Sequence, residues 1–326
     1  MNAREKGGGV VLPPILLAVL DADFTCNEPC EGGEAAYTCR FVSSIRTTLG
    51  ADDSEFETHW GECVGQVARE VGQHGFIYDP VVGIAAAAES DLMMRLHAVA
   101  WLYARMFTGY DAANHRVFRG HAYDAYRAAY SELGMTPVPE LLPFLQGCRD
   151  LGVSVSVVTN SAAASVCSVL MSGIGEKNRA FLPSVRGSAA KFDICIDEAE
   201  GPPWLPVEED KPVTFPPFIH LGSLGYPVPT RRPKYFDALQ ASRRDAARGT
   251  SKIVPAIQTL VAGDNTQLDL ALPDALGMRI ALVENDSTPC WDKAWMREPR
   301  QAHRRHPVTR LTDVLTVIRA SHGRTS

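Results

Sequence analysis

The chain has 326 residues, 45% of them hydrophobic, and carries a formal net charge of −6. This length and apolar content allow a sizeable core and room for an inserted domain. The mild negative charge gives no reason to expect a nucleic acid partner. We expect no membrane partner either, because the apolar run from Val10 to Leu20 is interrupted by Pro13 and Pro14 and no stretch is long enough to cross a bilayer.

The first predicted element is a buried strand over residues 15–20, followed at once by two aspartates. Its sequence, Ile-Leu-Leu-Ala-Val-Leu, has no polar alternation, which is typical of a strand covered on both faces of a parallel sheet. Asp21 and Asp23 follow it, at the strand end where α/β sheets bind ligands. A strand and an Asp-rich turn is the plainer interpretation. Because two adjacent acids are costly to bury without a cation, we favour a functional site.

Residues 26 to about 135 form a segment far longer than a connection needs. Apolar residues recur there at helical spacing, from Leu92 to Met106 and again from Val117 to Tyr130, so the segment is predicted to be helical. Polar or basic side chains such as those of His59, Trp60, Arg105 and His121 could reach a substrate, although packing or exposure is the better-supported role for each.

Cys26, Cys30 and Cys39 cluster just after the two aspartates. A structural zinc site usually needs four well-spaced ligands, and no second pair appears nearby. We therefore expect reduced thiols in a cytoplasmic protein, with a local disulfide or metal as the alternative. A signal peptide is not expected, because cleavage after the first apolar run would remove the first strand.

The second half of the chain is predicted to alternate helices with strands, as in α/β proteins. A helix with Gly152 as its C-terminal stop precedes a strand over 153–158, and Thr159 and Asn160 follow this strand directly. Residues 198–233 are too rich in Pro for a helix or central strand, and they predict either a flap beside the site or a plain surface loop.

A later strand ends in Gly263 and Asp264, and Asp269 stands five residues further on, near the start of a predicted helix. Gly263 is expected to let the chain turn sharply. Asp269 alone could serve merely as a favourable partner of the helix dipole. Together with Asp264, it is better interpreted as part of a site.

In this order the segments resemble the motifs of the haloacid dehalogenase superfamily. The first motif is D-x-D-x-T, here Asp21, Asp23 and Thr25, and the last is G-D-x-x-x-x-D, here with Asp264 and Asp269. The resemblance implies a Rossmann-like α/β fold, whose parallel sheet has helices on both faces, with an inserted α-helical cap domain. The implied division is a core of 1–25 and 136–326, a cap of 26–135, and a Pro-rich insertion at 198–233 within the core.

The resemblance also implies roles for these residues. Asp21 would be the nucleophile that forms an aspartyl-phosphate, and Asp23 the general acid and base. Mg²⁺ would be held by the Asp21 and Asp264 carboxylates and the Asp23 backbone carbonyl, with Asp269 orienting that shell. The phosphoryl oxygens would be held by Thr159 and the backbone amide of Asn160.

The superfamily's third motif, normally a Lys beside the nucleophile, is the point where this sequence departs from the pattern. In PTRRPKYFDALQ, Lys234 is the best candidate for the phosphate-binding cation, and Arg232 is a second one with a different geometry. A solvated basic turn is the alternative for this cluster.

The expected function is magnesium-dependent hydrolysis of a small phosphorylated metabolite. Asp23 favours ester hydrolysis over dehalogenation, because an alkoxide leaving group is helped by protonation and a halide is not. Phosphoryl transfer and dehalogenation stay open as alternatives, and so does a non-catalytic member that binds a ligand or a protein. A cation that reaches Asp21 would favour catalysis.

Overall fold

The computed structural model describes residues 12–79, 83–195, 216–247 and 253–323, with the backbone of 207–208 and 211–212. Within these residues six parallel strands form one sheet in the order β14-β13-β12-β1-β6-β7. The strands are Leu17–Leu20 (β1), Ser154–Val158 (β6), Ser184–Arg186 (β7), Thr259–Gly263 (β12), Arg279–Val283 (β13) and Arg305–Val308 (β14).

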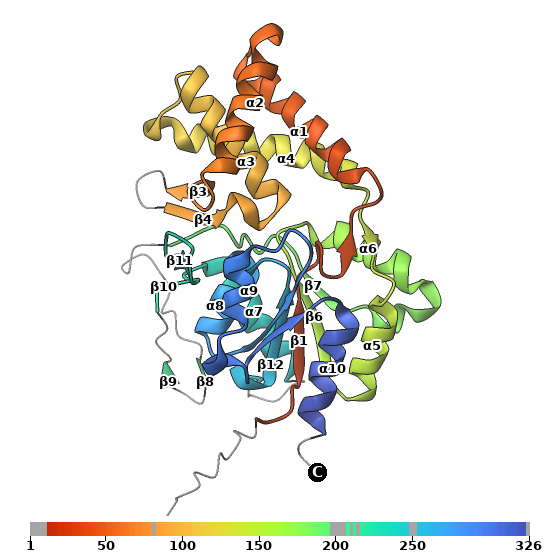
Figure 1. The fold of residues 1–326 in the computed structure, drawn as a ribbon. Coiled ribbons are helices and arrows are strands. Elements are labelled where there is room, and N and C mark those ends of the chain that lie inside the picture. The colour runs from red at the N-terminus through yellow and green to blue at the C-terminus, as the bar shows by residue number, and fades with distance from the viewer. Residues whose placement is uncertain are drawn as a thin grey trace, which may run out of the picture.

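Strand β1 lies inside the sheet, and its side chains alternate between two hydrophobic clusters. Leu17 and Val19 pack with helices α7, α8 and α9, whereas Ala18 and Leu20 pack with α5, α6 and α10 on the other face (Figure 1). An unbroken apolar run is needed because both faces of this strand are covered. The helices are Leu141–Asp150 (α5), Ala163–Ile174 (α6), Pro233–Ala246 (α7), Ala271–Ala275 (α8), Cys290–Met296 (α9) and Leu311–His322 (α10).

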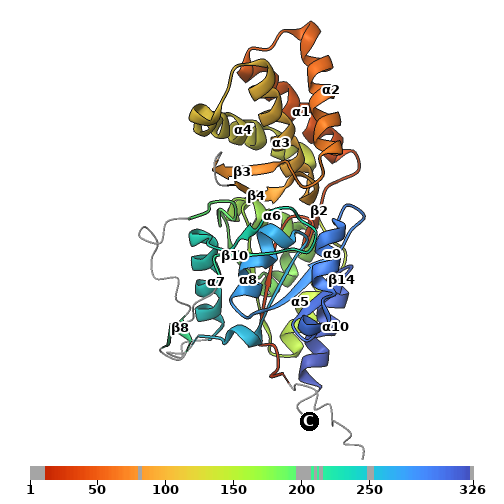
Figure 2. The ribbon, with the colours of Figure 1, turned by 60° about the vertical axis from the view of Figure 1, so that its left-hand side comes forward.

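The segment between β1 and α5 forms a cap above the carboxyl ends of the strands in both ribbon views (Figures 1 and 2). Its two connections to the core pair as short antiparallel strands, Asn27–Glu28 (β2) with Thr136–Pro137 (β5). The cap has its own aromatic-rich core. Its elements are Gly33–Leu49 (α1), Asp53–Arg69 (α2), Gly75–Asp79 (β3), Gly83–Ala87 (β4), Leu92–Phe107 (α3) and His115–Tyr130 (α4).

The predicted fold class, a parallel α/β core with an inserted α-helical cap, is confirmed by this arrangement. The β3–β4 hairpin was not predicted, and it is the part of the cap that faces the core (Figure 2). Its strands are five residues each and carry little alternation, so their sequence does not distinguish them from a helical segment.

Of the predicted Pro-rich insertion at 198–233, residues 198–206, 209–210 and 213–215 lie outside the described residues. The described part holds two antiparallel pairs apart from the main sheet, as expected of a segment rich in Pro. They join Val207–Glu208 (β8) to Lys211–Pro212 (β9) and Phe218–Ile219 (β10) to Val228–Pro229 (β11).

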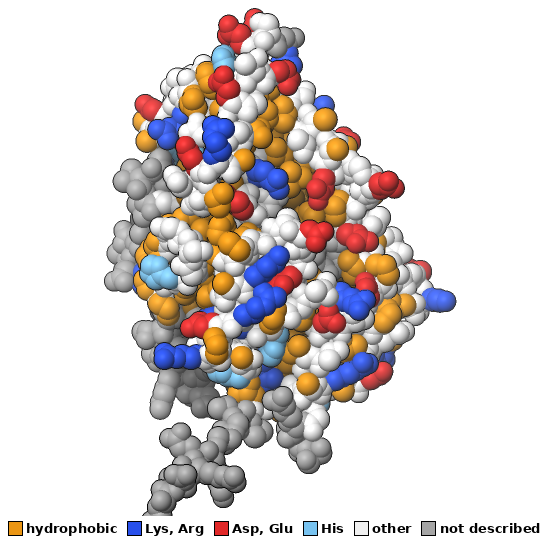
Figure 3. All heavy atoms as spheres, in the orientation of Figure 1, with side chains coloured by type: hydrophobic (Ala, Val, Ile, Leu, Met, Phe, Trp, Pro, Cys, Tyr) orange, Lys and Arg blue, Asp and Glu red, His pale blue; other side chains and the backbone are white. Residues whose placement is uncertain are grey.

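On the face shown in Figure 3, acidic and basic side chains lie interspersed and form no patch of one sign. Among the helices that the structure describes, none has the length and apolar character needed to span a membrane. All eight cysteines lie in the described residues and are free thiols. Cys26 is buried, whereas Cys30 and Cys39 are exposed.

Candidate active site

Three neighbouring strands bring the motif residues to one edge of the sheet. Asp21 follows β1, Asp264 follows β12 and Thr159 follows β6. Because β1 is parallel to both neighbours, with Leu20 opposite Ala262 of β12, these residues leave the sheet at the same level beneath the cap. A cavity of about 580 Å³ lies at this edge, and every predicted site residue except Arg232 lines it.

Asp21, Asp264 and Asp269 form a carboxylate cluster. Each offers one oxygen atom, and these atoms all lie within 4.8 Å of one another. Burial and the charges of Asp269 and Asp21 raise the pKa of Asp264 well above its ordinary value. Carboxylates this close repel one another unless a cation lies between them, and oxygen ligands of this kind suit Mg²⁺. The donor set therefore fits a divalent cation.

The structure gives a different reason for Gly263 than the sharp turn predicted from the sequence. Gly263 is the last residue of β12, and its φ is not positive. A Cβ atom there would lie only 2.6 Å from Cβ and Oδ2 of Asp269, so glycine makes room for this carboxylate. Asp269 itself lies in a π-helical turn, Thr266–Leu270 (η6), and not in the helix that follows. Such turns are frequent at functional sites.

A lysine that the sequence analysis missed lies beside the predicted nucleophile. Lys191 Nζ is 2.5 Å from Asp21 Oδ1 and 2.8 Å from Asp269 Oδ1, and the lysine side chain is 2% exposed. Burial lowers the pKa of Lys191, but the charges of Asp21 and Asp269 raise it and prevail, so the ammonium group stays charged. Burial raises the pKa of Asp21 to about 7, although Lys191 lowers it.

The loop that carries Lys191 has an unusual backbone. Ser188 and Ala190 have φ values of 55° and 44°, which residues with a side chain adopt rarely. The loop is fixed on both sides of Lys191, because Asn160 Oδ1 accepts the Lys191 N–H at 2.7 Å and the Arg232 guanidinium donates to the Lys191 carbonyl oxygen. Strained backbone held by its surroundings is common at functional sites.

Neither cation predicted from PTRRPKYFDALQ contacts Asp21. Lys234 is the second residue of α7, and its exposed ammonium group lies 3.2 Å from Asp193 Oδ2. Arg232 is fully buried and also donates to the carbonyl oxygens of Pro229 and Ala85, each at 3.1 Å, so it joins the cap strand β4 to the loop of Lys191. Little in the sequence marks Lys191, a single Lys in the unpatterned stretch GSAAKFD.

Asp23 is held by one residue of the cap and one of the core. The Tyr130 hydroxyl donates to Asp23 Oδ1 at 2.7 Å, and the Ser161 hydroxyl donates to Asp23 Oδ2 at 2.9 Å. Burial raises the pKa of Asp23, although both hydrogen bonds lower it. Tyr130 is the last residue of α4, so the cap reaches the predicted general acid directly. No signal in the sequence distinguished it from other helical tyrosines.

Thr159 and Asn160 lie beside this pair at the end of β6. The Thr159 hydroxyl oxygen accepts the Ser161 N–H at 3.1 Å, which leaves its own proton available to a ligand. Thr159 is buried, and both residues line the cavity. Their roles as phosphate ligands stay predictions.

The cap is fastened to the core beside the carboxylate cluster. The Gln267 side chain accepts the Ala87 N–H at 3.0 Å and donates to Ser90 Oγ at 2.8 Å. Asn265 Nδ2 donates to Asp91 Oδ2 at 3.2 Å. These contacts join the end of β4 to the loop after β12, so the roof of the cavity and its carboxylates form one hydrogen-bonded unit.

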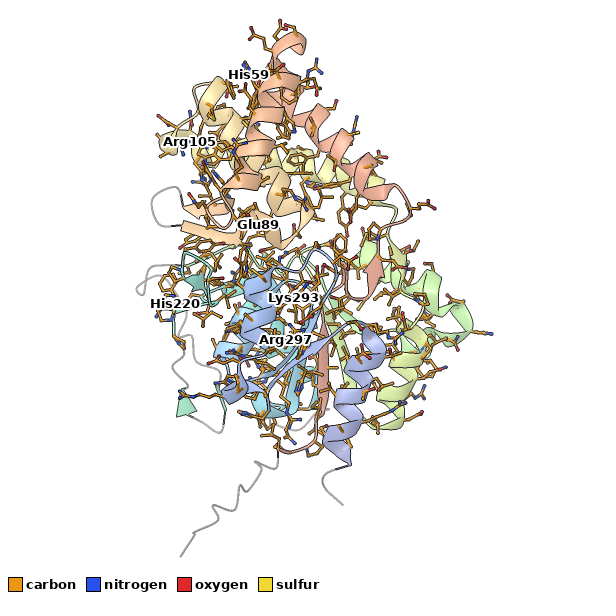
Figure 4. All side chains as sticks on the ribbon, viewed as in Figure 1. His59, Glu89, Arg105, His220, Lys293 and Arg297 are labelled. Atoms are coloured by element: carbon orange, nitrogen blue, oxygen red, sulfur yellow. The ribbon has the colours of Figure 1, made fainter. Side chains whose placement is uncertain are left out.

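The cap residues considered in the sequence, His59, Trp60, Arg105 and His121, do not line the cavity. Figure 4 shows His59 and Arg105 at the far end of the cap, whereas Glu89 lies at its junction with the core. His59 stacks on Phe107 with a centroid distance of 4.0 Å, and Trp60 is buried. Packing, the better-supported role, is what the structure shows for both.

The sequence matches no protein-family model, and no curated protein is similar to it. Among solved structures, a phosphonoacetaldehyde hydrolase-like protein from Oleispira antarctica is similar over 99% of this chain and 98% of its own, with 12% identity and a TM-score of 0.48. A 2-haloacid dehalogenase from Pseudomonas syringae pv. tomato matches over 94% and 99%, with 17% identity and a TM-score of 0.41. A HAD phosphatase from Thermococcus onnurineus matches over 93% and 98%, with 11% identity and a TM-score of 0.39.

The described fold and site define an α/β protein with an inserted helical cap and a carboxylate-lysine cluster at the sheet edge. In the order of its motifs, the chain resembles the haloacid dehalogenase superfamily.

Proposed function

We propose that the protein is a magnesium-dependent phosphatase that hydrolyses a small phosphorylated metabolite through an aspartyl-phosphate. The observation that carries this proposal is the pair formed by the Asp21 carboxylate and Lys191 Nζ, 2.5 Å apart within the lined cavity. A carboxylate can attack a negatively charged phosphoryl group only where positive charge offsets the repulsion. A cation that reaches Asp21 was expected to favour catalysis, and Lys191 is such a cation.

The chain's residues divide the reaction between them. Asp21 attacks the phosphorus atom in line, a new bond forms from its carboxylate oxygen, and the bond to the alcohol oxygen breaks. Asp23 gives a proton to the leaving alkoxide and later takes one from the water that hydrolyses the intermediate. The Thr159 hydroxyl and the Asn160 N–H donate to the phosphoryl oxygens.

The carboxylate cluster supports magnesium as the cofactor. The side chains of Asp21 and Asp264 would hold the ion with the Asp23 backbone carbonyl, and Asp269 would orient this shell while it holds Lys191. A bound Mg²⁺ would offset charge on the phosphoryl oxygens. Residues 26–135 would act as the cap domain, whose contacts at Gln267 and Arg232 shield the site from water.

Phosphate release tests the proposal. A panel of phosphorylated metabolites is incubated with Mg²⁺ or with a chelator, with wild type, Asp21→Asn and, as a matched control, Asp124→Asn on the exposed side of α4. We expect Mg²⁺-dependent release that is lost in Asp21→Asn and kept in Asp124→Asn, with equal thermal unfolding of all three proteins. Turnover by Asp21→Asn at the wild-type rate would exclude Asp21 as the nucleophile. Silence across the panel would favour a binding protein.

A further inference from the structure

The cavity has two chemically different ends. Its sheet end carries the carboxylates and Lys191. Its cap end is lined by a group of apolar side chains from both cap and core, and also by polar cap residues that include His97, Arg119 and Tyr126. We call these apolar side chains the junction cluster. They are Phe76, Met93, Met94, Phe192 and Leu268, and all of them line the cavity. With Ala86 they form a hydrophobic cluster, and Met93 joins it to the cluster of the cap, against which it also packs.

The junction cluster is not fully buried, unlike the hydrophobic core of a protein. Phe76, Met93 and Phe192 remain partly exposed at the cavity, although apolar side chains at an internal position are normally buried. The rings of Phe76 and Phe192 pack with centroids 5.0 Å apart and bridge β3 to the loop after Lys191. Their remaining apolar surface faces the cavity and is available to a ligand.

Phe24 extends this wall to the catalytic aspartates. It directly follows Asp23, lines the cavity and has a φ of 57°. A bulky residue adopts this conformation only at a cost, which the surrounding structure must offset. The chain thus places an aromatic side chain beside the predicted general acid, where the leaving group of the substrate must lie.

Basic side chains also line the cavity. Arg119 and Lys234 flank Asp193, at 3.7 Å and 3.2 Å, and Arg116 lines the cavity as well. The positive charge of these three side chains favours the approach of a phosphate dianion. Arg119 lies over the ring of Phe76, 5.4 Å from its centroid, so positive charge for a phosphate and apolar surface for the rest of a ligand lie side by side.

We propose that the alcohol part of the phosphate ester is aromatic or otherwise largely apolar, and that it packs on the junction cluster while its phosphate lies at Asp21. This inference rests on the proposed function and narrows its substrate. A cavity of about 580 Å³ is in the range of pockets that take ligands much larger than a two-carbon phosphate. A hydroxyl group packed against the apolar side chains of the junction cluster would lose water without a partner from that cluster.

A matched series of phosphate esters tests the proposal. Ethyl phosphate, 2-hydroxyethyl phosphate and 2-phenylethyl phosphate all release an alkoxide, so leaving-group chemistry differs little between them. We expect kcat/KM for the phenylethyl ester to exceed that for the ethyl ester by about 10- to 100-fold, the gain from burying one phenyl group. The hydroxyethyl ester should be no better than the ethyl ester. Equal values, or a preference for the hydroxyethyl ester, would overturn the proposal.

Variants of Met93 show whether the junction cluster is the surface that binds. Met93→Gln keeps the length of the side chain and makes it polar, whereas Met93→Leu keeps it apolar. We expect the glutamine variant to reduce the phenylethyl-to-ethyl ratio by about fivefold or more, because an unpaired amide is costly against an aromatic ring. The leucine variant should keep the ratio within about twofold. The same ratio in both variants would overturn the assignment of this surface.

Phosphonates, which the enzyme cannot hydrolyse by this route, separate this inference from the proposed function. Calorimetry with Mg²⁺ compares propylphosphonate with 3-phenylpropylphosphonate. Tighter binding of the phenyl compound without hydrolysis of any ester would support the ligand class and reject the phosphatase. Hydrolysis without preference, and equal binding of the two phosphonates, would reject the ligand class alone.

Discussion

Tyr130→Phe removes one hydroxyl group at the point where the cap meets Asp23. In the structure this hydroxyl donates to Asp23 Oδ1 at 2.7 Å, and Ser161 donates to the other carboxylate oxygen. The substitution keeps the ring, which packs on Tyr126 at a centroid distance of 5.6 Å, so the end of α4 should stay in place. Its effect should therefore be confined to the orientation of the predicted general acid.

The expected loss follows from the hydrogen bond. A hydrogen bond to a charged group contributes about 1.5–3 kcal/mol. Because Ser161 still holds Asp23, we take the lower end, about 1.5 kcal/mol, which corresponds to about a tenfold loss in rate. This loss should be seen only where protonation of the leaving group matters, since a nitrophenolate leaves without the help of an acid.

The assay compares kcat/KM for an alkyl phosphate with that for 4-nitrophenyl phosphate. This ratio of constants covers the steps up to cleavage of the ester, so the later hydrolysis of the aspartyl-phosphate does not enter. We expect a loss of about tenfold for the alkyl ester and less than about threefold for the nitrophenyl ester. Tyr110→Phe, a cap tyrosine that does not line the cavity, is the matched control and should change neither.

Two results would refute this reasoning. Equal losses with both esters would show that Tyr130 supports the site as a whole and not the proton transfer. An unchanged rate with the alkyl ester would show that Ser161 alone suffices to orient Asp23, or that Asp23 is not the acid.

Three further predictions concern charge and packing. Lys191→Met should reduce kcat/KM by about 10³-fold or more, because its ammonium group lies at Asp21. Lys234→Met should reduce kcat/KM by less than about threefold, because its ammonium group is exposed. Similar losses in both variants would contradict the assignment of Lys191 as the cation that acts at Asp21. Gly263→Ala should lower the free energy of unfolding by about 1–3 kcal/mol and weaken Mg²⁺ activation, because its Cβ would meet Asp269 at 2.6 Å. Gly61→Ala, in open space within α2, should instead be neutral or stabilising in the same melts. Burial raises the pKa of Asp292 to about 7, so the folded protein holds this proton more tightly than the unfolded chain does. The stability of the protein is therefore highest below about pH 4 with respect to this group, and this contribution is lost as the pH rises through 7. Urea unfolding should therefore show Asp292→Asn to be more stable than wild type at pH 8, by up to about 4 kcal/mol, with the difference shrinking toward pH 4; a constant difference would exclude titration of Asp292.

Local patterns in the sequence determined the parts of the site that follow strands. The run over 15–20 is apolar because β1 is covered on both faces, and that same burial makes the aspartates after it conspicuous. Parallel strands then bring Asp21, Thr159 and Asp264 to one edge, whatever their separation along the chain. For these residues the sheet alone fixes the geometry.

The positions of the site residues that lie on loops and on the cap follow only from the tertiary structure. Lys191 reaches Asp21 through a loop whose backbone is held by Asn160 and Arg232, and no spacing rule connects these positions. Lys234 occupied a more suggestive sequence position, yet the start of α7 leaves it exposed at the edge of the cavity. The sequence around Lys234 gave no information about the distance between Lys234 and Asp21.

The sequence by itself determined the parallel α/β core, the helical cap and the carboxylates at the strand ends, because periodicity and burial act over neighbouring residues. Only the tertiary structure decided the lysine at Asp21, the tyrosine at Asp23 and the apolar junction cluster. Each depends on side chains from segments far apart in the chain. Asn160 and Arg232 hold the loop that carries Lys191, whereas contacts of the cap with the core bring Tyr130 and the junction cluster into place. Such long-range contacts depend on how whole helices and strands pack, and a local sequence pattern does not predict them.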